Sequence, residues 1–399
     1  MTPRSPAAAL MSLALAAASA PAVAHAAEGQ GDWIVDARLR YETVSQDGFA
    51  DDAQALTLRA RLGYETPAWR GFKALVEAEG VTALADDYNS TTNGRIGYPL
   101  VLDPEAAEIN RAQVSWTGET ASVVVGRQRV ILGNARFVGN VGFRQNEQTF
   151  DAARLAFKVT PTTTVTWVYV DRVHRILGDD SPQGEWDSDS HLLQVETKTP
   201  VGQLTGYGYL LDLETAPLQS SATWGARLTG SRPLASGPAV TWEAEYARQG
   251  EYGANPVDFE LDYLALSAGL KTQDRYASLG VERLDGDGAR GFGTPLATLH
   301  AWQGWADLFL ATPAGGLRDI NLKAGITVPV GPRKLKLAAA VHDFTDADGD
   351  LAYGRELDLS ASVALTPKLT LEMKAARFDG DNPAFADRTK VWVTLELKL

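Results

Sequence analysis

The feature that most constrains the fold is a strict alternation of apolar and polar residues, which recurs along the chain in segments of about ten residues. In the last of these segments Val391, Val393 and Leu395 share one face, and Thr394 and Glu396 share the other. A period of two indicates a β-strand with two chemically different faces. Repeated strands of about ten residues are typical of a transmembrane β-barrel, whose outer face meets lipid and whose inner face meets water.

A soluble β-sandwich also shows this alternation, so the connections have to distinguish the two folds. Short turns with proline, such as Thr66-Pro67 and Thr366-Pro367, alternate with longer loops rich in Asp, Gly and Asn, which are 85–107, 175–190, 286–317 and 379–388. Alternating short and long connections favour the membrane barrel. We therefore predict an all-β fold, a transmembrane antiparallel β-barrel of about 18 strands. The predicted strands are 33–43, 54–64, 72–82, 108–117, 121–131, 150–159, 164–174, 191–199, 203–213, 223–231, 239–249, 259–270, 275–284, 318–328, 334–344, 356–365, 368–378 and 389–399.

The first residues have the pattern of a secretory signal peptide. Arg4 precedes an apolar run over 7–18, and the small residues Ala24 and Ala26 flank His25 in the manner of a cleavage site. The alternative is a membrane-anchoring helix, for which this alanine-rich run is too short. We predict a signal peptide at 1–26, a barrel at 27–399, and a location in the outer membrane of a Gram-negative cell.

Composition excludes several classes of protein. The formal net charge of −13 argues against nucleic acid as a partner. Without cysteine there is neither a disulfide framework nor a thiolate metal site. After the signal peptide no run of about eighteen apolar residues occurs, which excludes a bundle of membrane helices.

The polar phase of the predicted strands is rich in arginine. Because charges at mid-bilayer are costly, we expect this phase to face the lumen. It contains Arg38, Arg40, Arg59, Arg61, Arg111, Arg127, Arg129, Arg154 and Arg172, with Arg227, Lys323, Lys336 and Lys374 later in the chain. It also contains the acids Glu77, Glu79, Glu243, Glu245, Glu282 and Asp358. Two interpretations stay open: a generic porin whose lumen charges neutralise one another, and an arginine wall that guides anions by bidentate contacts to carboxylates.

One stretch sharpens this choice. The segment 123–155, VVVGRQRVILGNARFVGNVGFRQNEQTFDAARL, resembles the alginate export porin family of outer-membrane proteins, and the tryptophan-bearing stretch 292–319 supports the resemblance. The resemblance implies an eighteen-stranded barrel with an arginine-lined constriction that passes alginate. It assigns Arg111, Arg127 and Arg129 to that constriction. We also place Arg136 and Arg144 there, on a loop that folds toward the lumen, with packing on the barrel rim as the alternative.

From these residues we predict a porin that passes an anionic, uronate-like polysaccharide or oligosaccharide. The chain is more compact than the alginate exporter, which leaves the direction of transport open. The alternative is a general or small-anion uptake porin without a polysaccharide role. Expected partners besides the cargo are outer-membrane lipid and lipopolysaccharide, the barrel assembly machinery and, for export, periplasmic secretion partners. No cofactor and no metal is expected.

A barrel enzyme is the remote alternative. The histidines of the mature chain, His174, His191, His300 and His342, lie in no recognisable catalytic signature. His342 and Asp343 are adjacent and therefore face opposite sides of a strand. The acids of 343–356, which are Asp343, Asp346, Asp348, Asp350 and Glu356, lack the glycine position of an EF-hand. We expect a solvated extracellular loop there and no enzymatic function.

Overall fold

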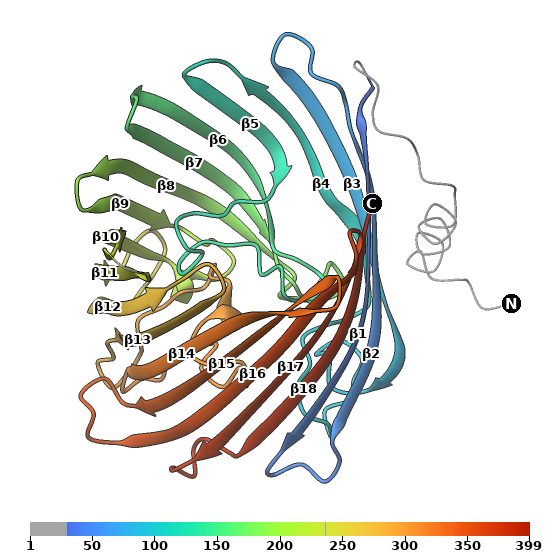
Figure 1. Cartoon of the computed structure of the whole chain (residues 1–399), viewed down its shortest axis with the longest axis vertical. Coiled ribbons are helices and arrows are strands. Elements are labelled where there is room, and N and C mark those ends of the chain that lie inside the picture. The colour runs from blue at the N-terminus through green and yellow to red at the C-terminus, as the bar shows by residue number, and fades with distance from the viewer. Residues whose placement is uncertain (1–29, 236) are drawn as a thin grey trace, which may run out of the picture.

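The computed structural model describes residues 30–399 except 236, and the predicted signal peptide lies outside the described residues. The chain forms one sheet of 18 antiparallel strands that closes on itself (Figure 1). The strands are β1 Asp32–Gln46, β2 Ala53–Glu65, β3 Phe72–Asp87, β4 Ala106–Thr117, β5 Ala121–Gln128, β6 Thr149–Thr160, β7 Thr163–His174, β8 Glu185–Thr199, β9 Gly202–Leu211, β10 Ser221–Pro233, β11 Ala239–Gly250, β12 Glu260–Lys271, β13 Arg275–Leu284, β14 Leu317–Val330, β15 Arg333–Thr345, β16 Ala352–Thr366, β17 Leu369–Gly380 and β18 Arg388–Lys398.

The predicted fold class is confirmed, and every predicted span overlaps one strand in order. The ring closes between β1 and β18, whose register runs from Asp36 opposite Lys398 to Gln46 opposite Arg388. Two short 3₁₀ turns, η1 (Pro217–Gln219) and η2 (Leu299–Ala301), interrupt the loops. Within the described residues, no helix has the length and apolar character needed to cross a membrane.

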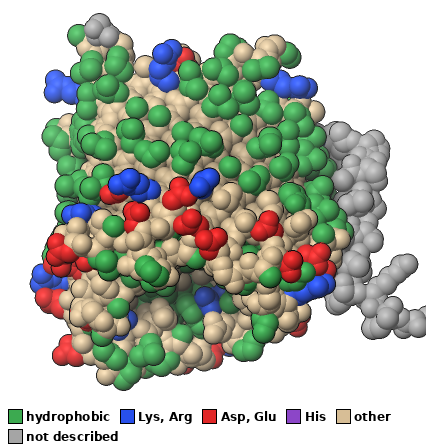
Figure 2. Space-filling model, turned by 90° about the horizontal axis from the view of Figure 1, so that it is seen from below, with side chains coloured by type: hydrophobic (Ala, Val, Ile, Leu, Met, Phe, Trp, Pro, Cys, Tyr) green, Lys and Arg blue, Asp and Glu red, His purple; other side chains and the backbone are tan. Residues whose placement is uncertain are grey.

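The outer face of the barrel is apolar. Outward side chains such as Val114, Leu279 and Leu322 are half or more exposed, at 52%, 60% and 50%. Near the short turns, aromatic rings pair, with Trp33 against Tyr64 at 5.1 Å between centroids. Apolar side chains cover much of the wall seen in Figure 2. A closed ring satisfies every strand edge, and an apolar outer band with aromatic side chains near its rim suits a bilayer. This is an outer-membrane β-barrel.

Short turns and long loops alternate as predicted, although the boundaries shift. β3 extends to Asp87 and β8 starts at Glu185, so the loops 88–105 and 175–184 are shorter than expected. The two longest connections, 129–148 and 285–316, do not project outward. Both fold into the ring of strands (Figure 1). We call 129–148 the strap and 285–316 the second loop.

The main hydrophobic core lies inside the barrel, because the strap and the second loop bring apolar side chains into it. Phe137 of the strap contacts Tyr263 edge-on at 5.2 Å and Phe292 of the second loop at 6.0 Å. Both phenylalanines are buried and belong to one cluster with Tyr207 and Tyr209 of β9. This core fixes the strap to the wall formed by β9 and β12, so the strap is a built part of the interior.

Candidate functional site: a charged strap across the lumen

The strap leaves the barrel wall at the end of β5. Gly126 has φ +112, and a Cβ there would lie 2.3 Å from the carbonyl oxygen of Ala112, so only glycine fits. The strand then ends at Gln128, and Arg129 already belongs to the strap, whereas the sequence predicted a strand to residue 131. Further along, Val141 has φ +49, a rare conformation for a β-branched residue. Its N–H donates to Thr298 Oγ1 at 3.3 Å in the second loop.

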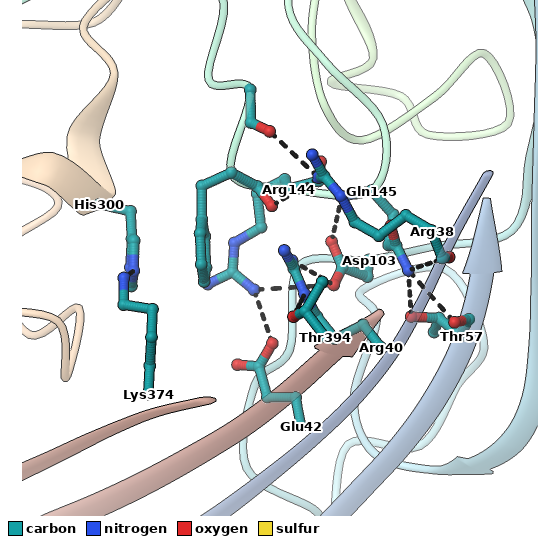
Figure 3. Close-up of polar contacts among 12 residues, drawn as sticks. Arg38, Arg40, Glu42, Thr57, Asp103, Arg144, Gln145, His300, Lys374 and Thr394 are labelled. Carbon is teal, nitrogen blue, oxygen red and sulfur yellow. Dashed lines mark hydrogen bonds and ion pairs between the residues drawn. The ribbon is translucent and has the colours of Figure 1, made fainter. Parts of the chain in front are cut away.

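Arg144 connects the strap to β1 and to the second loop. Its guanidinium donates to Glu42 Oε2 at 3.1 Å (Figure 3) and to Asp307 Oδ2 at 2.8 Å. Lys390 of β18 contacts the same two carboxylates at 3.1 and 2.7 Å. Burial opposes the charge of Arg144, but Glu42 and Asp307 outweigh it and raise the pKa of the guanidinium. All four side chains are at most 4% exposed, so this is a buried ion cluster that holds the strap in place.

Glu147 connects the strap to β2 and β4, on the same side of the ring as β1. Its carboxylate accepts a hydrogen bond from Asn110 of β4 at 2.7 Å, and it pairs with Arg129 and, at 3.4 Å, with Arg61 of β2. Burial alone would raise the pKa of Glu147, but these arginines lower it to about 2. The strap is therefore held by a negatively charged side chain at Glu147 and by a positively charged side chain at Arg144.

Two further contacts complete the attachment. Arg136 donates to Glu282 of β13 at 2.5 Å. Arg38 of β1 donates to the backbone carbonyls of residues 142, 143 and 144 at 3.1–3.2 Å. The strap thus reaches the closely spaced strands β1, β2 and β4 and also the distant β13, and it narrows the lumen.

An aromatic and basic cluster lies beside the strap. Phe143 stacks on His300 at 3.5 Å with parallel rings, and Lys374 of β17 lies 3.7 Å over the Trp305 ring. Burial, above all, lowers the pKa of His300 to about 3. The neutral imidazole donates from Nδ1 to Asp307 at 2.8 Å and accepts from Lys374 at Nε2 at 2.6 Å. Figure 3 shows His300 and Lys374 facing each other beside the Arg144 cluster.

The structure separates the eleven predicted arginines into three groups. Five are at most 5% exposed and serve as internal ion-pair partners, which are Arg40, Arg59, Arg61, Arg136 and Arg144. Four are inward-facing and partly exposed, which are Arg38, Arg111, Arg129 and Arg154. The prediction that all eleven line the substrate path is revised for the first group, because their guanidinium groups are covered by protein.

The third group, Arg127 and Arg172, faces outward. Arg127 follows the exposed, lipid-facing Val125 by two residues and pairs with Asp151 at 3.0 Å. Arg172 precedes Val173, which is buried in the interior core, and pairs with Asp187 at 3.0 Å. Placing these two arginines in the lumen was wrong. A strand bulge between Val170 and Arg172 turns the Arg172 side chain to the outer face. The alternation of apolar and polar residues does not reveal such a bulge.

These two arginines belong to an outer charged belt at the long-loop end of the strands. Its members follow the outward phase, and each contacts a carboxylate on its own strand, on a neighbouring strand or, for Arg283, in an adjoining loop. They are Arg127, Arg172, Arg248, Arg283, Arg355 and Arg377. Figure 2 shows rows of basic and acidic side chains below the apolar band of one face. Such a belt ends the lipid-facing surface.

Sequence reasoning missed the carboxylates that position the strap. Glu42, Asp103, Glu147 and Asp307 are at most 9% exposed and lie within the ion clusters. A signal was present for two of them, because Glu147 lies in the FRQNEQTFD stretch and Asp307 in the tryptophan-rich WQGWADLF stretch. Their partners lie more than 80 residues away in several cases, which no local pattern reports.

The histidine and acidic-loop predictions have clear outcomes. His342 contacts Asp319 at 3.0 Å in the interior, and Asp343 contacts Arg355 on the outer face, so the two neighbours do face opposite sides. In the acidic loop, Asp346 Oδ1 accepts the N–H groups of Gly349, Asp350 and Leu351, which forms a local turn. Within the described chain, the acids of 343–356 do not form a set of three ligands.

No protein-family model and no curated protein sequence matches the chain. Solved structures do match it. OccAB4 of Acinetobacter baumannii superposes with a TM-score of 0.71 at 14% identity, covering 93% of this chain and 98% of that chain. OpdK of Pseudomonas aeruginosa, solved with vanillate, gives 0.68 at 12%, over 92% and 98%. OccK2 (OpdF) of the same organism, solved with glucuronate, gives 0.65 at 13%, over 92% and 98%.

At these identities the similarity establishes the fold, which is the 18-stranded barrel of the Occ and Opd outer-membrane porins. None of the three proteins is described as carrying alginate, so the resemblance to alginate export porins gains no support here.

Proposed function

We propose that the chain is an outer-membrane channel for the uptake of small organic anions, above all carboxylates of monosaccharide size or smaller. The observation that carries the proposal is the wall beside the strap. There the partly exposed Arg38, Arg111 and Arg129, with side chains 11%, 14% and 29% exposed, face the narrowed lumen. A guanidinium fork binds a carboxylate through two parallel hydrogen bonds and keeps its charge at any physiological pH.

Two cations on the inner face strengthen this proposal. Arg154 of β6 and Lys374 of β17 have no carboxylate within ion-pair distance among the described residues. Arg111 and Arg129 are already neutralised by Glu77 and Glu147. Weak, partly compensated sites attract an anion without trapping it, as conduction requires.

The strap favours small cargo over a polymer. A polysaccharide would require the strap to leave its place, and the strap is held by buried ion pairs at Arg136, Arg144 and Glu147. The neighbours solved with glucuronate and vanillate are consistent with small carboxylates as cargo. We therefore propose small-anion uptake in preference to passage of an alginate-like polysaccharide.

Refolded protein in a planar bilayer tests the proposal. Under a KCl gradient the reversal potential should have the sign of anion selectivity, and glucuronate should block the current more than neutral glucose does. Arg129→Ala should weaken block by about tenfold, more at low salt. Arg127→Ala is the matched control, because it lies in the same motif but faces outward, and it should leave block unchanged. Cation selectivity, or equal effects of the two substitutions, would contradict the proposal.

A further inference from the structure

At the long-loop end of β6, β7 and β8, the outer charged belt contains a histidine between two carboxylates. His174 is the last residue of β7 and Glu185 the first residue of β8, and the two face each other across the ladder. Asp179 comes from the loop between them. One ligand atom from each of the three lies within 4.8 Å of the others.

The hydrogen bonding of His174 fixes which nitrogen is available. Nε2 lies 2.9 Å from Asp151 Oδ2 of β6, which accepts its hydrogen. Nδ1 lies 2.8 Å from Glu185 Oε1 but makes no hydrogen bond, and the residue is only 3% exposed. In this tautomer a buried nitrogen lone pair faces carboxylate oxygens, which is repulsive unless a cation lies between them.

The arrangement has the geometry of a metal site. Two ligands bound to one divalent ion at about 2.1 Å lie about 3.0–3.4 Å apart for angles between 90° and the tetrahedral value, so His174 Nδ1 and Glu185 Oε1, which are 2.8 Å apart, would have to separate slightly to bind one ion. A carboxylate that accepts the other ring N–H of a ligating histidine is the usual outer partner, and Asp151 occupies that position. Arg127 in turn holds Asp151 at 3.0 and 3.2 Å.

The loop is shaped to bring Asp179 to this place. Gly178 has φ +72, and a Cβ there would lie 3.3 Å from the Ala106 side chain, so the loop packs on the start of β4. Asp179 also contacts Glu108 of β4. Among the described residues, the four carboxylates of Asp151, Asp179, Glu185 and Asp187 form arginine ion pairs with Arg127 and Arg172 only. The site therefore has negative charge for a cation to neutralise.

We propose that His174, Asp179 and Glu185 bind a divalent transition metal of the zinc class and thereby fasten the loop 175–184 to the barrel rim. One imidazole nitrogen with two carboxylates suits Zn²⁺, whereas Ca²⁺ prefers oxygen ligands throughout. His174 and Glu185 lie on the outer belt, and the loop that carries Asp179 also approaches Asn146 of the strap, 3.8 Å from a Cβ placed on Gly178. The rival explanation is an imidazolium that pairs with Asp151 and Glu185 and binds no metal.

Metal binding to refolded, lipopolysaccharide-free protein tests this. After removal of metal with a chelator, calorimetry and elemental analysis should find one Zn²⁺ per chain and no comparable uptake of Ca²⁺. His174→Ala should abolish binding, and Asp151→Asn should weaken it about tenfold or more. Glu185→Gln and Asp179→Asn alter exposed side chains, so they test the site without threatening the fold.

Two variants serve as controls. His191→Ala alters a histidine that stacks on Trp167 and contacts Tyr169 at a tilt, and Asp262→Asn alters a carboxylate elsewhere on the belt. Both should keep one Zn²⁺ per chain. Zn²⁺ should also slow amide hydrogen exchange of 175–184 in the wild type but not in Glu185→Gln. Absence of Zn²⁺ from the wild type, or full binding by His174→Ala or by both carboxylate variants, would overturn the proposal in favour of the imidazolium.

Discussion

At the scale of single residues, the role of an arginine in this barrel depends on how many carboxylates surround it and on how deeply they are buried. Arg144 lies within ion-pair distance of three buried carboxylates and is 4% exposed, while Arg355 pairs with one exposed carboxylate and its side chain is 75% exposed. A buried ion that loses its partner is left without solvent or counter-charge, whereas an exposed one is hydrated. The same residue type is therefore structural in the strap and of little consequence to stability on the belt.

Arg144→Ala tests this distinction. The docked strap should be destabilised by about 3–5 kcal/mol, because Glu42 and Asp307 stay buried with less counter-charge. The expected results are a larger single-channel conductance and faster amide hydrogen exchange over 133–148. Arg355→Ala on the belt is the control and should change neither. Unchanged conductance in Arg144→Ala would show that the remaining contacts at Phe137, Arg136 and Glu147 hold the strap without Arg144.

The sequence predicted correctly that most of these arginine side chains face the lumen, but it did not predict what each of them does there. Alternation correctly turned Arg38, Arg40 and Arg59 inward, because apolar neighbours must face lipid. It could not tell that Arg59 would be covered while Arg38 kept some exposure, since partners such as Glu396 lie at the other end of the chain. It also failed at Arg172, where one bulged residue shifts the phase.

At the scale of elements, the strap and the strands differ in what determines them. Strands arise from a local period of two, so their positions could be read from the sequence. The strap has no regular secondary structure, and its place depends on Phe137 in the inner core and on ion pairs to β1, β2, β13 and the second loop. Its glycines and asparagines indicated a long excursion, but only the assembled barrel shows where it goes.

The attachment of the strap should depend on acid pH. The pKa of Glu147 is lowered to about 2 from 4.5, so its contribution of about 3 kcal/mol is complete above pH 4.5 and is lost as the pH falls toward 2. Conductance should therefore rise as the pH falls through this window. Glu147→Gln should conduct more than the wild type at pH 6 and show a weaker pH dependence. An equal dependence in both would assign the effect to other carboxylates.

At the scale of the whole molecule, stability depends on closure of the ring. Val393 of β18 lies opposite Tyr41 of β1 at the centre of the closing ladder. Proline there removes a backbone N–H from the sheet and leaves backbone groups of the strands unpaired at membrane depth, where no water can replace the lost hydrogen bonds. Val393→Pro should lose the compact, heat-sensitive band of folded barrels on electrophoresis. Val393→Ala keeps the backbone N–H and should retain that band.

The strap also affects the pairing of strands in the barrel wall. By departing at Gln128 it shortens the β4–β5 ladder to six paired positions, whereas the seam between β1 and β18 has eleven. A ring under lateral tension parts at its shortest seam. The mechanically weakest line of this barrel is therefore the wall at the root of the strap, and the junction of the first and last strands is stronger than it.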